Sequence, residues 1–111
     1  MEQTVEELLL IISEKENDIK SAEKSFSVLY YRYAEFLDQS VKRQAKSNGL
    51  YDEEFVNSVV NNVFYEVFKK PLGFSFDVNR HKSEDTAFKA WISVIAKNKF
   101  NDLLRSSIKY F

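Results

Sequence analysis

Apolar residues recur at intervals of three and four in four separate segments of the chain, at 4–16, 21–47, 52–70 and 87–106. This spacing is typical of one face of an α-helix. The chain has two Gly and one Pro in 111 residues, so we expect long helices joined by short connections. The pattern predicts an all-α fold: a bundle of three to four helices with a long antiparallel hairpin and the last helix packed across it.

Residues that favour helix ends stand at the borders of these segments. Thr4 and Glu7 have the spacing of a capping box, and Asp52 is suited to cap the third helix at its start. The Asn-Gly pair at 48–49 tolerates the left-handed backbone that ends a helix, and Pro71 cannot continue one. We expect the last helix to begin between residues 83 and 86.

The third segment has the composition of a strand but the periodicity of a helix. It is rich in Val, which favours a β-strand, yet its apolar residues come in pairs every four positions. We therefore predict a helix. The residues expected on apolar faces are Val5, Leu8, Leu9 and Ile12; Phe26, Leu29, Tyr30, Tyr33, Leu37 and Val41; Phe55, Val56, Val59, Val60, Val63, Phe64, Val67 and Phe68; and Phe88, Ile92, Ile95, Ala96, Phe100 and Leu103.

Aromatic residues make up 15% of the chain, with ten Phe, six Tyr and one Trp. Trp91 lies beside the apolar stripe of the last helix, and we expect it to be mainly structural. Tyr30, Tyr31 and Tyr33 are expected in the core or at its rim. His81 is interpreted as an ordinary loop residue.

Charge is distributed unevenly, although the net charge is -1. Residues 80–111 hold 7 basic and 3 acidic side chains, whereas residues 1–79 hold 9 basic and 14 acidic ones. The basic end could approach nucleic acid with one face, while small domains also show such imbalance by chance. The connection at 71–85 is polar in its second half, and long loops in small domains are more often functional than idle.

The composition excludes several kinds of site. Without Cys there is no disulfide or cysteine nucleophile, and a single His cannot form a His-based metal cluster. No apolar run approaches the roughly 20 residues of a membrane span, and the acidic N-terminus differs from a signal peptide. Neither a phosphate-binding Gly loop nor a nucleophile elbow is present. We expect a cytoplasmic, non-enzymatic protein without cofactor, metal or membrane partner.

One stretch of the last segment resembles a known motif. Residues 88–105 read F-K-A-W-I-S-V-I-A-K-N-K-F-N-D-L-L-R. This is similar to F-R-x-W-L-x-x-I-A-R-N-x-x-x-D-x-L-R, the segment of bacterial sigma-70 family factors, especially the extracytoplasmic-function group, that recognises the promoter −10 element. The matching positions include Phe88, Trp91, Ile95, Ala96, Asn98, Asp102 and Arg105.

Three shorter stretches resemble the same family in the same order. Residues 26–33 are similar to its F-x-x-L-Y-x-x-Y segment, and residues 61–68, NNVFYEVF, to its Q-E/D-V-F-x-x-x-W/F segment. Residues 74–82, FSFDVNRHK, resemble the loop before its −10 helix. We accordingly divide the chain into an accessory N-terminal helix at 1–18 and a sigma region 2-like helical domain at 19–111.

The resemblance implies a transcription initiation module with two tasks. One helix would dock on the clamp helices of the β′ subunit of RNA polymerase, through Asn61, Asn62, Tyr65 and Glu66. The last helix and the preceding loop would bind and help to melt the non-template strand of the −10 element. The residues that this assigns to DNA binding are Asn79, Arg80, Lys82, Lys89, Lys97, Asn98, Lys99 and Arg105. The resemblance also implies an anti-sigma factor as a partner to consider.

The chain departs from the family pattern at several points, including an acidic group, Asp52 to Glu54, placed about one turn earlier and a tail with few basic residues after the last helix. Asn61 and Asn62 stand where the family has Gln and an acidic residue. No counterpart of region 4, the helix-turn-helix that reads the −35 element, is found, so the chain is either a piece of a longer factor or a free-standing module. Two other functions stay open: a sigma-like regulatory protein-interaction module without promoter reading, and a helical protein that binds duplex DNA without polymerase.

Overall fold

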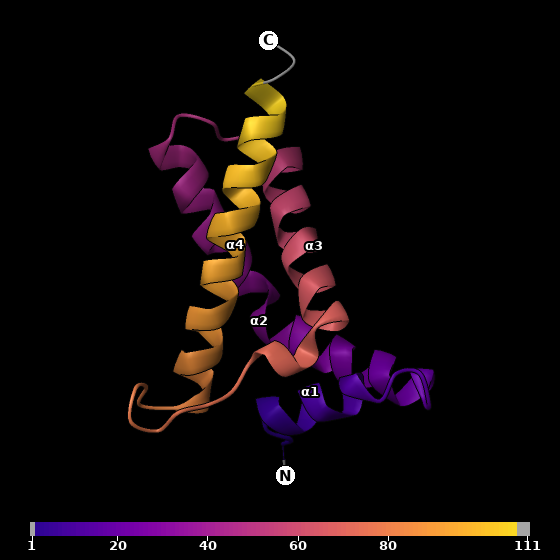
Figure 1. Cartoon of the computed structure of the whole chain (residues 1–111). Coiled ribbons are helices and arrows are strands. Elements are labelled where there is room, and N and C mark those ends of the chain that lie inside the picture. Colours follow the sequence, from indigo (N-terminus) through magenta and orange to yellow (C-terminus); the bar gives the residue numbers. More distant parts are fainter. Residues whose placement is uncertain (1, 109–111) are drawn as a thin grey trace.

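Helices form the whole regular structure of residues 2–108, the part of the chain that this computed structural model describes. They are α1 (Val5–Ser13), α2 (Ile19–Ser47), α3 (Glu53–Lys69) and α4 (Glu84–Ile108), with a 3-10 turn, η1 (Pro71–Gly73), after α3. The helices α2 and α3 run antiparallel, α4 runs back in contact with both, and α1 lies across the lower end (Figure 1). The all-α class predicted from the periodicity is confirmed.

The predicted N-caps hold the starts of α1 and α3. The side chain of Thr4 accepts the N–H of Glu7 at 3.1 Å, and the Glu7 carboxylate accepts the N–H of Thr4 at 3.4 Å, which completes the capping box. Asp52 accepts the N–H of Glu54 at 3.0 Å. Each contact satisfies a backbone donor that has no partner within its helix.

The ends of α2 show one confirmed and one shifted boundary. The helix ends at Ser47, and Gly49 has the left-handed φ of 67° that was expected there. At the other end α2 begins at Ile19, earlier than predicted, because Asp18 caps it by accepting the N–H of Ser21 at 3.1 Å. The helix α3 ends before Pro71, as expected.

A single core joins all four helices. The helix α2 contacts the other three helices, and α3, whose paired apolar positions form two adjacent rows, contacts α2 and α4. Partly buried aromatic residues such as Phe26, Phe55 and Phe68 pack against the core. The buried residues of this core cluster are Val5, Leu8, Leu9, Ile12, Leu29, Tyr33, Leu37, Val41, Ala45, Val56, Val59, Val60, Val63, Phe64, Val67, Phe74, Ala87, Phe88, Ile92, Ala96 and Phe100.

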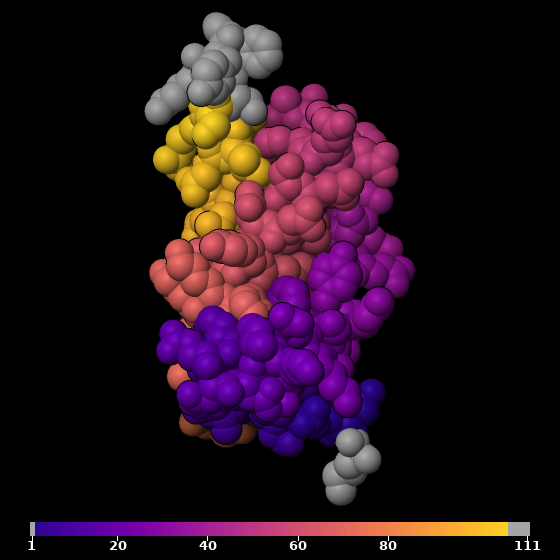
Figure 2. Space-filling model, turned by 90° about the vertical axis from the view of Figure 1, so that its right-hand side faces the viewer, coloured from indigo at the N-terminus to yellow at the C-terminus, as the bar shows by residue number. Residues whose placement is uncertain are grey.

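The first helix is fastened to the bundle by both apolar and polar contacts. Its four predicted core residues are each exposed by 2% or less. Glu84, the first residue of α4, accepts the N–H groups of Val5 at 2.7 Å and Glu6 at 3.1 Å. In Figure 2 α1 (indigo) covers the foot of the molecule below α3. The helix α1 shares its core with the other helices. The division of the chain at residue 18 stays a prediction.

Trp91 packs against the core, as expected for a mainly structural residue, and is partly exposed. Its ring centroid lies 5.6 Å from that of Phe74 and 5.7 Å from that of Phe88. Phe88 in turn packs on the buried Tyr33, with centroids 4.7 Å apart. Gly73 allows η1 to approach this cluster, because a Cβ at that position would lie only 3.2 Å from Cζ2 of Trp91.

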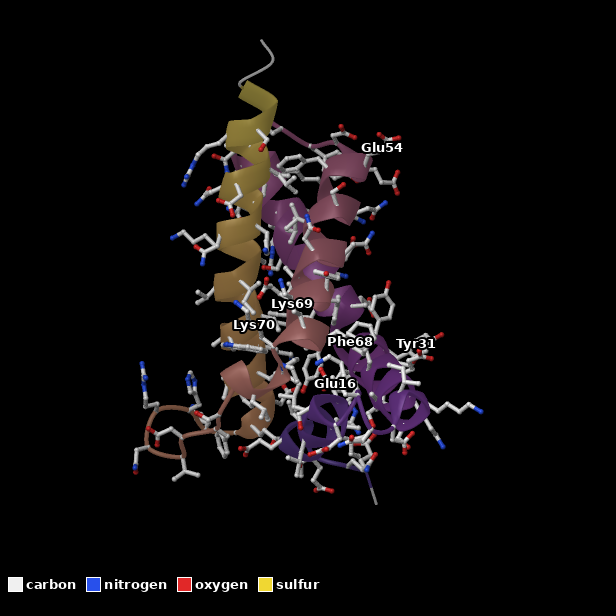
Figure 3. The ribbon with its side chains drawn as sticks, turned by 45° about the vertical axis from the view of Figure 1, so that its right-hand side comes forward. Glu16, Tyr31, Glu54, Phe68, Lys69 and Lys70 are labelled. Atoms are coloured by element: carbon white, nitrogen blue, oxygen red, sulfur yellow. The ribbon has the colours of Figure 1, made fainter. Side chains whose placement is uncertain are left out.

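The expectation for the tyrosines of α2 is wrong for Tyr31. Tyr33 is buried, and Tyr30 is 38% exposed at the rim of the core, where its ring centroid lies 4.9 Å from that of Phe64. Tyr31 is 84% exposed and projects from α2 (Figure 3). It lies between Tyr30 and Tyr33 in sequence, and its helical angle turns it away from the row that faces the core.

We predict that Phe64→Ala will destabilise the fold by about 3 kcal/mol or more, because it removes a buried ring that contacts Phe26 and Tyr30. Chemical unfolding monitored by circular dichroism would measure the change. The control Tyr31→Ala removes an exposed ring and should change the free energy of unfolding by less than about 0.5 kcal/mol. Equal stability of Phe64→Ala and the unchanged protein would contradict the packing of α3.

Candidate nucleic-acid interface and docking groove

The outward side of α4 carries a row of polar and cationic residues. Lys97, Asn98 and Arg105 are exposed, and their spacing places them on one side of the helix. Val94 and Ala90 continue the exposed row towards the start of α4. At 1.5 Å per residue the row from Ala90 to Arg105 is about 22 Å long. It offers donors and cations along a path that an extended polymer could follow.

The connection between η1 and α4 presents the other exposed candidates from a hydrogen-bonded turn. The Asp77 carboxylate accepts the N–H of Asn79 at 2.9 Å. The backbone oxygen of Asp77 accepts the N–H groups of Arg80 at 3.1 Å and His81 at 3.2 Å. The side chains of Asn79, Arg80 and Lys82 are exposed. They are therefore held close to the start of α4 by a defined backbone rather than by an open loop.

A cavity of about 320 Å³ lies between this connection and α4. Trp91 and Phe74 give it an aromatic wall, Arg80 supplies a cation, and two Ala residues of α4 leave room between them. This combination suits a planar aromatic group with polar edges. The lining residues are Gly73, Phe74, Ser75, Arg80, His81, Ala87, Ala90, Trp91 and Val94.

His81 lies in the connection, as expected, and also borders this cavity. The signal available in the sequence was weak, because it required knowing that the turn at Asp77 directs residues 80 and 81 towards Trp91. The place of Val94 in the cavity wall could not be predicted either, because a single exposed Val on a helix is common.

Lys89, one of the predicted DNA-binding residues, is held by the protein itself. Its ammonium lies 3.2 Å from the Asp85 carboxylate and 5.1 Å from the centroid of the Phe36 ring. Burial raises the pKa of Tyr33 above its usual range, and the nearby negative charge of Asp85 adds to this effect. Lys89 is therefore directed towards α2 rather than along the exposed row of α4.

Lys99 is also engaged within the fold. Its Nζ lies 3.6 Å from Oε1 of Glu66, and the two side chains are 31% and 25% exposed. This ion pair joins a predicted DNA-binding residue to a predicted polymerase-binding residue, because Lys99 faces α3. Asn61, Asn62 and Tyr65 are exposed on α3 and form an open ridge.

An aromatic groove of about 390 Å³ runs beside this ridge between α2 and α3. The Phe26 ring packs edge-on against Phe68, with centroids 5.2 Å apart, and Lys15 lies 5.5 Å from the Phe68 centroid. Figure 3 shows Phe68 and Glu54 at opposite ends of α3. The lining residues are Glu23, Phe26, Tyr30, Asn61, Phe64, Tyr65 and Phe68.

The sequence contained a signal for this groove that the periodicity alone did not use. Phe26 and Tyr30 are four residues apart on one helix, and Phe64 and Phe68 are four apart on the next. Two such aromatic pairs on adjacent helices pack against each other and leave ring faces at the surface. Of the residues that line the groove, only Asn61 and Tyr65 were among the predicted site residues.

The chain matches no family model, no curated protein and no solved structure in the three comparisons that we made. Within residues 2–108, none of the helices has the length and apolar character needed to cross a membrane. The same part of the chain contains no group of three or more His, Asp or Glu side chains placed to hold a metal ion.

We predict that the Glu66–Lys99 ion pair contributes less than about 1 kcal/mol to stability, because both ends retain contact with solvent. A double-mutant cycle of Glu66→Gln and Lys99→Met, followed by chemical unfolding, would measure the coupling energy. The pair Lys42 and Asp38, 2.9 Å apart on α2, serves as a reference of similar exposure. A coupling well above 1 kcal/mol would show that the pair is structurally essential.

Proposed function

We propose that this chain is a sigma region 2-like transcription initiation module that docks on the β′ clamp helices of RNA polymerase and binds the −10 element as a single strand. The observation that carries the proposal is the position of the motif residues. Lys97, Asn98 and Arg105 are exposed in one row of α4, and Trp91 forms the wall of a cavity at the start of the same row.

The nucleic-acid side of the proposal requires two kinds of contact. Cations must neutralise phosphates, and a surface must receive an unstacked base. Lys97 and Arg105 are suited to the first task. The cavity with Trp91, Phe74 and Arg80 is suited to the second, because an aromatic wall can stack on a base while a guanidinium contacts its edge or phosphate.

The polymerase side of the proposal rests on the exposed ridge of α3. Asn61 and Asn62 can donate and accept hydrogen bonds, and Tyr65 is 65% exposed beside them. Asn61 and Tyr65 also line the aromatic groove, so a docked helix would contact amide groups and apolar rings together. The weak net charge of -1 is compatible with a module that a partner delivers to DNA.

One observation favours a second function, a sigma-like regulatory protein-interaction module without promoter reading. Lys89 and Lys99 are paired within the fold to Asp85 and Glu66, which reduces the number of cations open to phosphate. The aromatic groove, in contrast, is open to a protein partner. The two functions differ in whether the exposed row of α4 binds a single strand.

We predict that Lys97→Ala combined with Arg105→Ala will weaken binding to single-stranded DNA and flatten its salt dependence. Two lost phosphate contacts should reduce the slope of log K against log salt by about 1.4 for a single strand. Fluorescence anisotropy across a salt series measures both quantities.

The matched control for this experiment is Lys20→Ala combined with Lys24→Ala, two exposed lysines in the first turns of α2. The control should retain the original slope. Equal slopes for both double variants would remove the α4 row from the function and leave the regulatory module as the better account.

We predict that a purified β′ clamp-helix fragment will bind the chain in the micromolar range or better and that Asn61→Ala combined with Asn62→Ala will abolish this binding. The physical reason is the loss of four hydrogen-bonding groups from the exposed ridge. Isothermal titration measures the affinity. Asn17→Ala, an exposed amide outside the ridge, is the control. Undiminished binding by the double variant would place the docking surface elsewhere.

A further inference from the structure

Two cavities join into one groove along α2 and α3. The aromatic groove described above shares Tyr30 and Asn61 with a second cavity of about 420 Å³, which continues towards the start of α3. The lining of this second cavity includes the carboxylates of Glu35 and Asp38. The two cavities together, which we name the long groove, change from aromatic rings at one end to carboxylates and amides at the other.

The acidic end of the long groove has carboxylates that a partner can reach. Asp38 is paired with Lys42 at 2.9 Å, but Glu35 is exposed. Glu54 is also exposed, about one turn before the first lining residue of α3 and on the same side of the helix. Figure 3 shows Glu54 at the opposite end of α3 from Phe68, which lies at the aromatic end. Glu35 and Glu54 are therefore placed to attract cations.

The exposed row of α4 has the complementary order of residues. It begins with the apolar Ala90 and Val94 and continues with the cations Lys97 and Arg105. The row is about 22 Å long, and α3 measures about 21 Å from the aromatic end of the long groove to its acidic end. Asp102 lies beside the row and carries an opposing charge, so the charge match is partial. The similar length and order still allow apolar groups to meet apolar groups and cations to meet carboxylates along one helix.

The row and the long groove lie on different sides of the bundle, so one copy cannot join them. On α3, Glu66 contacts Lys99 of α4, and the groove-lining residues lie on the other side of the helix. In Figure 3 α4 is on the left, whereas Phe68 and Tyr31 are on the right. The two complementary surfaces can therefore meet only between two copies of the chain.

We propose that the long groove binds the α4 row of a second copy of this chain. The docked helix runs antiparallel to α3, so that Val94 meets the exposed ring of Tyr65 and Arg105 meets Glu54. The charges of the chain have the same polarity, with 14 acidic and 9 basic side chains in residues 1–79 and 3 acidic and 7 basic ones in residues 80–111. Complementary charge fixes the register in which the copies dock.

The contact is head to tail, because it joins two different surfaces. A pair of copies keeps an open groove at one end and an open row at the other, so further copies can add. The association needs neither nucleic acid nor polymerase and is therefore independent of the proposed function. It covers the same row and groove, so self-association and the proposed binding exclude each other.

Sedimentation velocity of the whole chain, without nucleic acid, measures the association at concentrations up to about 1 mM and at low and high salt. The groove variant combines Glu35→Lys with Glu54→Lys. The row variant combines Lys97→Glu with Arg105→Glu. The two variants are studied separately and as an equimolar mixture, and circular dichroism checks that each retains its helices.

The matched control combines Glu2→Lys with Glu6→Lys. These two carboxylates are exposed, line neither cavity and lie outside the row. The control changes the net charge by the same amount as the groove variant, so it separates the effect of position from the effect of total charge.

We expect the unchanged chain and the control to form dimers and larger species whose proportion rises with concentration and falls with salt, because salt screens exposed charges. Each reversal variant alone should associate at least about tenfold more weakly, because like charges then face each other. The mixture of the two variants should regain the association, since each reversed surface meets an oppositely charged surface on the other variant.

Three results would overturn the proposal. The unchanged chain could stay monomeric up to about 1 mM, which would leave the long groove to a different protein. The association could persist in both reversal variants, or their mixture could fail to regain it. None of these results bears on the proposed function, which the single-strand and clamp-helix experiments test separately.

Discussion

The fold depends on the width of the apolar surface of α3. Its apolar residues form two adjacent rows, so the helix can be covered by α2 and by α4 at the same time. A helix with a single apolar row could pack against only one neighbouring helix. The side of α4 that packs on α2 and α3 is buried, and its outward row from Ala90 to Arg105 stays in solvent. The surface available for binding is thus a consequence of how the core is filled.

The two candidate surfaces differ in chemistry because they are built from different elements. The groove between α2 and α3 is formed by helix-borne rings, Phe26 against Phe68 and Tyr30 against Phe64, and is apolar. The cavity beside α4 has one wall from a helix and another from a turn, which adds a guanidinium to the aromatic surface. An apolar groove suits another protein helix, whereas a mixed cavity suits a polar planar group.

The sequence predicted most of what depends on neighbouring residues, except the cap at Asp18, and missed contacts between distant residues. Periodicity assigned all four helices, and local residues such as Thr4 and Asp52 set their starts. The exposure of Tyr31 could not be read from the count of aromatic residues, because one position along a helix changes its direction by about 100°. The pairing of Lys99 with Glu66 was hidden for a different reason, since it joins two helices whose relative rotation the sequence does not specify.

The contact between Glu84 and the start of α1 links two residues that are 79 positions apart. During synthesis on the ribosome, α1 emerges long before the residue that caps it. Until α4 has been made and packed, the first amides of α1 can bond only to water and to Thr4. Among the four described helices, α1 is therefore translated before the others, but its first amides reach their final partner only when α4 is in place.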